Sequence, residues 1–576
     1  MNEALLIYTV AIVFLLFISR KVFVRLRLSR AKHPSLRGHS KWSRRIAAQV
    51  PFFEYDYDEM FACDGAPKTI AKQRQHGLDK LRLLTREKTS TSIEFSSSIE
   101  ESISDVQFTA AYRIPFPFRN AVPKELRLGS IVEETQGVQI KDVDSNWSYD
   151  LAGSYGVNVF GYDFYKECLQ AGLEKVSQLG PVLGPYHQLI KDNVEKIKKI
   201  SGLDEVSFHM SGTEAVMQAV RLARYHTKRS HLVRLCGAYH GWWDGVQPGV
   251  GNTRKVNDVY TLSDLSETTL KVLETRKDIA CVLINPMQAF HPNSDAAGDA
   301  KLVASDRSTA FDREAYTYWL KQIRDICTQR GIVLIFDEVF TGFRLAYRGA
   351  QKYFGIQADM VTYGKTLGGG LPVGVVAGKH ALMKRFIDDK PANISFARGT
   401  FNSHPYVMAT MNEFLHRIEE DYYQETYAIA NGVWDRRVES LNSRLQEREL
   451  PVKIANMHSV LSVIYTLPSR FNWMFQFYLQ AEGLEISWIG SGRFIMSLNY
   501  TDDDFNAVSQ RLISAAEKMQ ADGWWWQSEH LSNKSIKRQM LNDMLVAKFP
   551  LLKPLIKTLD ISVDDNRFGS FDKWLK

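Results

Sequence analysis

Residues 332–378 constrain the fold more than any other part of the chain. A short apolar run in this stretch ends at Asp337 and Glu338, and a second strand-like run ends at Lys365, just before a glycine-rich turn. Short apolar runs are typical of parallel strands that are buried on both faces and carry polar residues at their carboxyl ends. The stretch therefore predicts a carboxylate and a lysine at one edge of a buried sheet.

A carboxylate and a lysine at neighbouring strand ends are the pair that pyridoxal phosphate requires. The lysine forms a Schiff base with the cofactor, and Asp337 would keep the pyridine nitrogen protonated so that the ring accepts electrons. Two plainer interpretations stay open at this point. Asp-Glu after a strand is often a helix N-cap or a metal ligand, and a lysine before glycines is often an exposed loop residue.

A helix start and an aromatic pair add to this site. Residues 211–213 (Ser-Gly-Thr) precede an amphipathic helix that begins at Glu214, where backbone N–H groups and the two hydroxyls form an anion site. An ordinary Ser/Thr N-cap explains the same residues. Tyr239 and His240 follow another strand-like run, where the tyrosine ring either stacks on a planar cofactor or packs in the core. Strand-like and helical runs alternate from about residue 200 to 380, which predicts a mostly parallel sheet with a site at its carboxyl edge.

Composition excludes several other classes of protein. The five cysteines lie far apart without a CxxC spacing, which argues against a disulfide framework and against a metal site. The net charge of +7 would suit a nucleic-acid-binding protein, but residues 20–45 contain ten Lys or Arg and no acid. Without that block the chain has no basic excess, so we expect no nucleic-acid partner.

An apolar run, residues 4–18, lies directly before the basic block. Flanking residues can extend it to the length of a membrane span, and it is apolar on every face, unlike a surface-lying amphipathic helix. No signal-peptide cleavage site follows it. We therefore expect a single N-terminal transmembrane helix, and the positive-inside rule predicts a membrane protein whose catalytic domain is cytoplasmic.

Five motifs in order, SGTEA, YHG, FDEVFTGFR, GKTLGGGLPVG and RGTFNSHP, resemble the class III aminotransferases of the fold-type I pyridoxal-phosphate enzymes. The similarity covers roughly residues 110 to 520, and it is greatest to glutamate-1-semialdehyde aminomutase and to the aminotransferase modules of lipopeptide and polyketide assembly lines. It implies an α/β fold, with a large domain built on a mostly parallel sheet of seven strands and a smaller α+β domain. It also implies pyridoxal 5'-phosphate, an amino-acid amine donor, a carbonyl acceptor and a homodimer with shared active sites.

The resemblance also assigns roles to individual residues. Lys365 matches the Schiff-base lysine, Asp337 the partner of the pyridine nitrogen and Tyr239 the stacking aromatic, and these three are the expected catalytic residues. Gln288 resembles a glutamine that reaches the ring hydroxyl, and Thr400 a residue that closes the phosphate site from the other subunit. No metal ligand is expected. The full set expected to bind the cofactor is Ser211, Gly212, Thr213, Tyr239, His240, Gln288, Asp337, Val339, Lys365 and Thr400.

We divide the chain into six segments. They are a membrane anchor with its basic flank (1–30), an appended segment that is partly helical around 68–87 (31–110), the first part of the small domain (111–180), the large cofactor-binding domain (181–410), the rest of the small domain (411–525) and an appended tail (526–576). The serine-rich residues 89–105 show no sustained period.

The predicted function is a membrane-anchored aminotransferase that moves an amino group from an amino-acid donor to an aldehyde or ketone. Aromatic residues are frequent within 471–478 and 524–526, which suggests a hydrophobic acceptor, such as an acyl-derived carbonyl in lipid or natural-product biosynthesis. The same rings are also explained as core or as a membrane-interface belt. Asn285 stands where the family usually has glutamate, which weakens any transfer of substrate specificity. The alternatives are an intramolecular 2,1-aminomutase and a non-catalytic, membrane-tethered scaffold.

Overall fold

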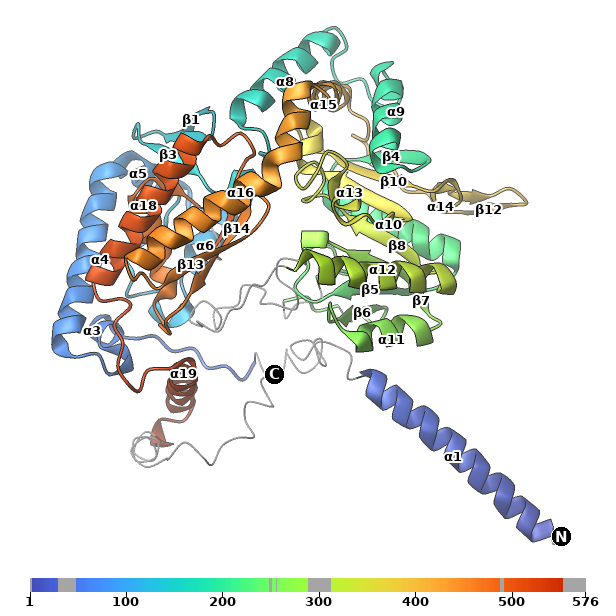
Figure 1. Cartoon of the computed structure of the whole chain (residues 1–576), viewed down its shortest axis with the longest axis horizontal. Coiled ribbons are helices and arrows are strands. Elements are labelled where there is room, and N and C mark those ends of the chain that lie inside the picture. The colour runs from blue at the N-terminus through green and yellow to red at the C-terminus, as the bar shows by residue number, and fades with distance from the viewer. Residues whose placement is uncertain are drawn as a thin grey trace.

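A seven-stranded sheet brings the ends of the site-bearing strands to one edge. The computed structural model describes residues 3–29, 48–247, 251–254, 256–287, 312–486 and 492–552. The strand order is β4 (Glu205–His209), β10 (Gly374–Gly378), β9 (Met360–Gly364), β8 (Val333–Asp337), β7 (Ile279–Ile284), β5 (His231–Leu235) and β6 (Val259–Leu262). Strand β10 is antiparallel to both neighbours and the other pairs are parallel, so the prediction of a mostly parallel sheet is confirmed (Figure 1). The helices around it are α9 (Leu189–Ser201), α10 (Gly212–Thr227), α11 (Glu267–Thr275), α12 (Arg313–Arg330), α13 (Gly349–Phe354) and α14 (His380–Met383).

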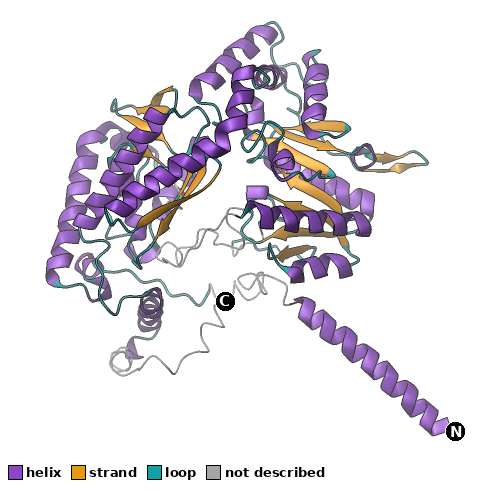
Figure 2. Ribbon diagram, in the orientation of Figure 1, coloured by secondary structure: helices purple, strands orange, loops and turns teal. Residues whose placement is uncertain are grey.

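Alternate residues of the central strands face opposite sides of this sheet. In β8, Val333 and Ile335 join the core under α10, whereas Leu334 and Phe336 join the core that includes the apolar face of α12. Helices cover both faces of the sheet, as Figure 2 shows, and every residue of β8 is buried. The strand therefore has a continuous apolar sequence rather than an alternating one.

Two smaller sheets and several long helices form a second lobe. One sheet has the order β1 (Val132–Gln136), β2 (Gln139–Asp142), β3 (Trp147–Asp150) and β15 (Leu484–Glu485), and the other has β13 (Val452–Met457), β14 (Val460–Tyr465) and β16 (Arg493–Ile495). Strand β15 pairs in parallel with β3, so segments far apart in the sequence form one unit. The helices of this lobe and of its junction with the large sheet are α8 (Tyr162–Val176), α15 (Pro405–Arg417), α16 (Asp421–Glu447), α17 (Phe475–Ala481) and α18 (Asp502–Ala521).

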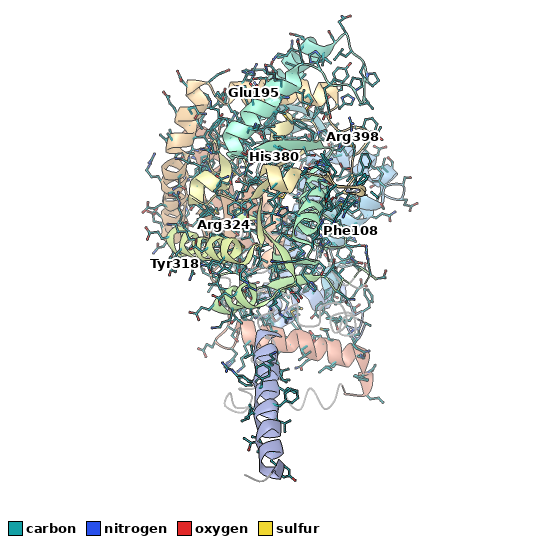
Figure 3. All side chains as sticks on the ribbon, turned by 90° about the vertical axis from the view of Figure 1, so that its right-hand side faces the viewer. Phe108, Glu195, Tyr318, Arg324, His380 and Arg398 are labelled. Carbon is teal, nitrogen blue, oxygen red and sulfur yellow. The ribbon has the colours of Figure 1, made fainter. Side chains whose placement is uncertain are left out.

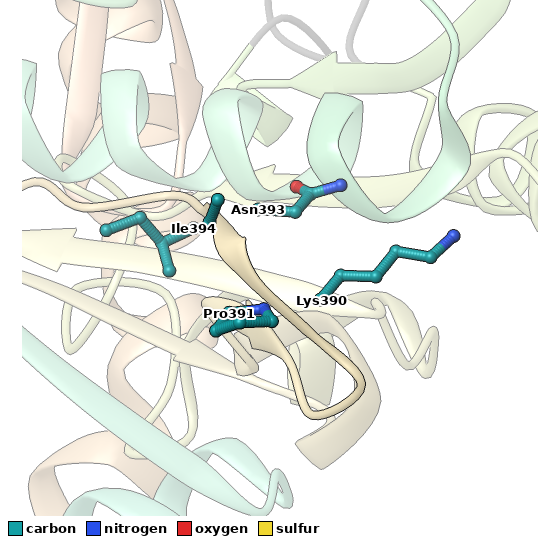
Figure 4. Close-up of a pocket in the computed structure, with 5 residues that line it drawn as sticks. Lys390, Pro391, Asn393 and Ile394 are labelled. Carbon is teal, nitrogen blue, oxygen red and sulfur yellow. The ribbon is translucent and has the colours of Figure 1, made fainter.

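A two-stranded hairpin extends from the large-sheet lobe. It consists of β11 (Phe386–Ile387) and β12 (Lys390–Ile394), and it points away from the body of the molecule (Figure 1). The side chains of β12, including Lys390 and Asn393, are drawn in Figure 4. Every residue of β12 is exposed, including Ile394, and Tyr225 Oη of α10 donates a hydrogen bond to Asn393 O at 2.6 Å.

The aromatic residues of the carboxyl-terminal part belong to the core. Phe471, Trp473 and Trp524 are at most 1% exposed, and the Trp525 indole N–H donates to Asn472 Oδ1 at 2.9 Å. Of the eight aromatic residues within 471–478 and 524–526, seven are buried and Trp526 is half-buried, so the interpretation as core is confirmed for the seven. The hypothesis of a hydrophobic acceptor loses those seven as support, because they have almost no exposed surface.

The appended segments pack on the second lobe. They contain α3 (Tyr57–Phe61), α4 (Lys68–Lys88), α5 (Ser90–Ile99), most of α6 (Ser104–Tyr112) and α19 (Asn533–Lys548), whereas α7 (Lys124–Arg127) belongs to the first part of the small domain. Helix α4 confirms the helix predicted around residues 68–87. The buried guanidinium of Arg470 pairs with Asp64 at 2.6 Å. It also donates to Tyr55 Oη and to Gln539 Oε1 of α19, both at 2.9 Å. One buried cation thus joins both appended segments to the lobe.

The amino-terminal run forms α1 (Glu3–Ser29), which extends outward from the molecule (Figure 1). Within the described ranges, no helix has the length and apolarity that crossing a bilayer requires. The predicted transmembrane helix is therefore not supported. The apolar run is interrupted by Arg20 and Lys21 before it reaches the roughly 20 residues of a typical span.

Candidate functional site

The carboxylate of Asp337 lies at the carboxyl end of β8 and is held by three donors. It is 3% exposed, and its Oδ1 accepts hydrogen bonds from Val339 N and Thr362 Oγ1, both at 3.2 Å. Its Oδ2 accepts a hydrogen bond from His240 Nδ1 at 2.7 Å. The buried His240 Nε2 has no hydrogen-bond partner among the described residues. Asp337 is thus fixed in orientation, and it is neither a helix N-cap nor part of a metal cluster in the described ranges.

Lys365 lies at the same edge, directly after β9. Strands β8 and β9 are parallel, with Asp337 opposite Thr362, so the lysine comes three residues further along the neighbouring strand. Its Nζ donates to Tyr155 O at 2.6 Å. Burial lowers the pKa of Lys365, Asp337 acts in the opposite direction, and the nearby Arg344 lowers the pKa further. A lysine with a lowered pKa is a better nucleophile near neutrality, so it is not an ordinary solvated loop residue.

The start of α10 lies beside these two strand ends. A Cβ added to Gly212 would lie 2.6 Å from Val339 Cγ1, so only glycine fits here. Ser211 is the N-cap, because its Oγ accepts from Glu214 N at 3.2 Å, and the plainer interpretation of this residue is therefore confirmed. The first N–H groups of a helix have no intrahelical partner, so this capped terminus still offers donors to an anion. Thr213 is in contact range of the loop at Gly241.

Tyr239 and His240 lie in the loop after β5 but have different surroundings. His240 is buried against Asp337, whereas the Tyr239 ring is 61% exposed and does not pack in the core. Tyr239 O accepts from Asn285 Nδ2 at 3.4 Å. Burial and the neighbouring Asp337 raise the pKa of Tyr239. An exposed ring close to that carboxylate is free to stack on a planar ligand.

Two of the predicted residues are less well placed. Gln288 lies outside the described residues. Thr400 is exposed in the loop before α15. This loop lies next to the start of α10, since a Cβ on the adjacent Gly399 would be 3.8 Å from Glu214 Oε2. Arg398 of the same loop, labelled in Figure 3, donates to Gly184 O at 3.3 Å. The predicted contribution of Thr400 to a second subunit is not tested by a single chain.

The sequence interpretation missed Tyr155 and Arg344. Tyr155 contacts Lys365 through its backbone carbonyl, which no residue pattern specifies. Arg344 belongs to the motif FDEVFTGFR but was given no role, although it is 0% exposed. The sequence hint of the turn that contains Tyr155 is the pair of glycines at 153 and 156, which both have positive φ in the structure.

The residues present fit pyridoxal phosphate. The start of α10 would hold the phosphate, Asp337 the ring nitrogen, and Lys365 the aldehyde carbon, which are the three functional groups of that cofactor. Val339 contacts the glycines at 212 and 364, so it lies between the anion site and the lysine strand. Tyr239 supplies the aromatic surface described above.

Residues 121–516 match the family described as Aminotransferase class-III. A glutamate-1-semialdehyde 2,1-aminomutase of Alkaliphilus oremlandii is 35% identical over 293 residues, which is 50% of this chain and 67% of the relative. The enzyme of the same name from Methanocaldococcus jannaschii is 29% identical over 398 residues, which is 66% of this chain and 82% of the relative.

Solved structures with a similar fold include a transaminase with PLP bound, with 24% identity and a TM-score of 0.60 over 75% of this chain and 99% of the other. They also include a glutamate-1-semialdehyde aminomutase from Pseudomonas aeruginosa, with 16% identity and a TM-score of 0.62 over 78% and 99%. At these identities the likeness establishes the fold, whereas the family follows from the sequence match.

Proposed function

Because the chain belongs to the class-III aminotransferase family, we propose that it is a pyridoxal-phosphate-dependent enzyme that moves an amino group from an amino-acid donor to an aldehyde or ketone. One observation carries the proposal. The amine of Lys365 and the fixed carboxylate of Asp337 lie at the ends of adjacent parallel strands, beside the start of a long helix.

The residues of the site divide the work of this reaction. Bound pyridoxal phosphate supplies an aldehyde and an electron-accepting ring. Asp337 would hold the ring nitrogen protonated, and His240 and Thr362 keep the Asp337 carboxylate oxygens in place. Lys365 would hold the aldehyde carbon of the cofactor, and its Nζ would accept and return the proton that moves during transfer. Tyr239 and Val339 would supply an aromatic and an aliphatic side chain to the ring.

The acceptor is proposed only as an aldehyde or ketone. An acyl-derived carbonyl now rests mainly on the resemblance to assembly-line enzymes, since all but one of the aromatic residues that suggested it, Trp526, are buried. Turnover of a set of carbonyl compounds that differ in chain length tests this point. Activity restricted to short, water-soluble aldehydes would exclude the acyl substrate.

An intramolecular 2,1-aminomutase is the second candidate, because the relatives named above carry that name. The two functions differ in their need for a separate acceptor. An aminotransferase given only an amino-acid donor stops after one half-reaction with the cofactor in its amine form, whereas a mutase turns over its single amino-aldehyde substrate. A non-catalytic scaffold has no use for the arrangement of Lys365 and Asp337, and a purified protein that never binds the cofactor would support it.

We also propose a homodimer in which Thr400 closes the phosphate site of the second subunit. Support comes from exposed apolar side chains close to the site in sequence, among them Met210, Trp242 and Phe401. Sedimentation of the purified protein tests this assembly.

Membrane attachment through residues 1–30, with a cytoplasmic catalytic domain, is a separate proposal. It is supported by the exposed apolar residues Phe14 to Phe17, which are followed by Arg20 and Lys21. Extraction of cell membranes with alkaline carbonate tests it, because a loosely bound protein is released and an anchored one is retained.

A further inference from the structure

The lysine of the site is held by a strained turn. Residues Gly153–Gly156 form a 3-10 turn in which Ser154 and Tyr155 have φ of 45° and 55°. Both residues carry a Cβ, so this left-handed conformation is unfavourable and persists only where its surroundings fix it. The turn also presents Tyr155 O to Lys365 Nζ at 2.6 Å. Any contact that fixes the turn therefore also positions the Tyr155 carbonyl oxygen that accepts the hydrogen bond of Lys365.

Arg344 forms hydrogen bonds with the carboxyl-terminal end of this turn. Its Nη2 donates to Gly156 O at 3.4 Å and to Asn158 O at 3.2 Å. Its Nη1 donates to Met496 O at 2.7 Å and to Ser459 Oγ at 3.1 Å. One guanidinium thus connects the turn to the carboxyl-terminal sheet of the second lobe.

Arg344 does not serve as the ion-pair partner of an acidic side chain. Arg344 is completely buried, and its four hydrogen bonds to described residues go to neutral oxygen atoms, whereas Asp150 acts on it only from a distance. A buried cation without an acid is costly, so its four contacts to neutral oxygen atoms indicate a positional role.

A shared aromatic ring places Arg344 close to the lysine. The Phe340 ring centroid lies 5.4 Å from Arg344 Cζ and 5.8 Å from Lys365 Nζ. The same ring packs on Gly156, since a Cβ at that position would lie within contact distance of Phe340. The turn, the arginine and the lysine therefore form one packed unit.

We propose that Arg344 is a positioning residue for Lys365, acting through the turn of residues 153–158, whose Tyr155 carbonyl holds the amine in place. This inference rests on the proposed function. The ionisable groups around the unit are Asp337 beside the lysine and Asp150, Tyr165, Tyr427 and His458 beside the arginine.

Two substitutions separate position from charge. Arg344→Lys keeps a cation but has a single ammonium that cannot reach the turn and the carboxyl-terminal sheet together. Arg344→Met removes the charge as well. The matched control is Arg437→Lys, because Arg437 also donates to a backbone carbonyl (Tyr500 O, 2.8 Å) but has no contact with the turn in the described structure.

The full-length protein is measured in two ways. Without cofactor, formaldehyde and cyanoborohydride methylate the amine of Lys365, and mass spectrometry follows the rate of methylation. Formaldehyde is small, so this reaction needs no fixed orientation of the amine. With added pyridoxal phosphate, visible absorbance reports linkage of the cofactor to the lysine, which does need the orientation.

We expect Arg344→Lys to link the cofactor about tenfold more slowly, as the loss of hydrogen bonds from a charged group predicts, and to keep its methylation rate within about twofold. Arg344→Met slows both reactions, and Arg437→Lys slows neither. A folded Arg344→Lys protein that links the cofactor at the parent rate overturns the inference.

If the arginine variants do not fold, Ser459→Ala is used instead, because it removes one of the four acceptors of Arg344. Linkage about threefold slower supports the inference, and an unchanged rate overturns it. A parent protein that never links pyridoxal phosphate overturns the proposed function, and this inference with it. That result is distinct from a parent protein and a variant that link it equally fast.

Discussion

A methyl group at position 212 tests how tightly the candidate cofactor site is built. In Gly212→Ala the new Cβ would lie 2.6 Å from Val339 Cγ1 and 2.9 Å from Cγ2. Carbon atoms in contact prefer about 3.5–4.0 Å, so Val339 or the start of α10 must move by about 1 Å. Overpacking of this kind costs about 1–3 kcal/mol. Each of these two groups is expected to touch the cofactor, so whichever one moves, we expect the affinity for the cofactor to fall about tenfold to hundredfold.

The assay is titration of the purified protein with pyridoxal phosphate, together with a thermal melt. Gly129→Ala is the matched control, because Gly129 has no atom within 4 Å of an added Cβ and does not have a positive φ. In the double variant with Val339→Ala, removal of the two methyl groups should restore the melting temperature. An unchanged affinity in Gly212→Ala would refute the assignment of α10 and Val339 to the cofactor site.

Three further predictions concern charge. Asp64→Asn removes the nearer carboxylate of the buried Arg470 and leaves only Asp543, at 3.9 Å. It should lower the free energy of unfolding by about 3 kcal/mol, measured with denaturant, and a loss below about 1 kcal/mol would show that the pair does not join the segments. Burial lowers the pKa of His458 to about 3, so below its ordinary value of about 6.5 only the unfolded state binds the proton and stability falls as the pH falls. Between pH 6.5 and 5.5 His458 contributes about 1 kcal/mol to this loss, so the loss measured in His458→Gln should be smaller by about that amount, and an equal loss in both proteins would contradict the prediction. Asp337→Asn should slow amino transfer by about two orders of magnitude. Thr362→Val, which removes one hydrogen-bond donor to the Asp337 carboxylate, should slow it about tenfold. Equal rates in the parent and both variants would contradict the role of Asp337.

The sequence predicted those parts of the site that regular secondary structure delivers. Asp337 and Lys365 follow apolar strands, and parallel neighbouring strands place their carboxyl ends at one edge of a sheet. Gly212 and Ser211 were predicted because a helix start has a local signature. In each case, residues close together in the sequence determine where the side chain lies.

The parts that were missed depend on contacts between distant residues. Residues 89–105 show no helical period, yet α5 forms there, because the N–H groups of Thr91 and Ser92 donate to Asp144 at 2.7 and 2.9 Å. That cap comes from more than fifty residues away. Tyr155 acts through a backbone carbonyl in a strained turn, and Arg344 acts through carbonyl groups of two other segments. No pattern of residue types records such contacts.

The carboxyl-terminal aromatics illustrate the opposite error. Closely spaced rings within residues 471–478 and 524–526 suggested a hydrophobic binding surface, but packing against one another and against the appended segments buries all of them except Trp526. Phe471 and Trp524 lie 5.1 Å apart at the ring centroids, and Phe61 of α3 lies 6.1 Å from Trp524. Composition alone cannot separate a core from a ligand pocket, because both consist of the same apolar residues.

The measurement that tests the central claim most directly is the location of the cofactor attachment. The full-length protein is incubated with pyridoxal phosphate, reduced with borohydride, digested and analysed by mass spectrometry, with Lys365→Ala treated in parallel. The account predicts one pyridoxyl group on the peptide that contains Lys365 and none in the variant. Attachment to a different lysine, or equal labelling of the parent and the variant, would contradict it.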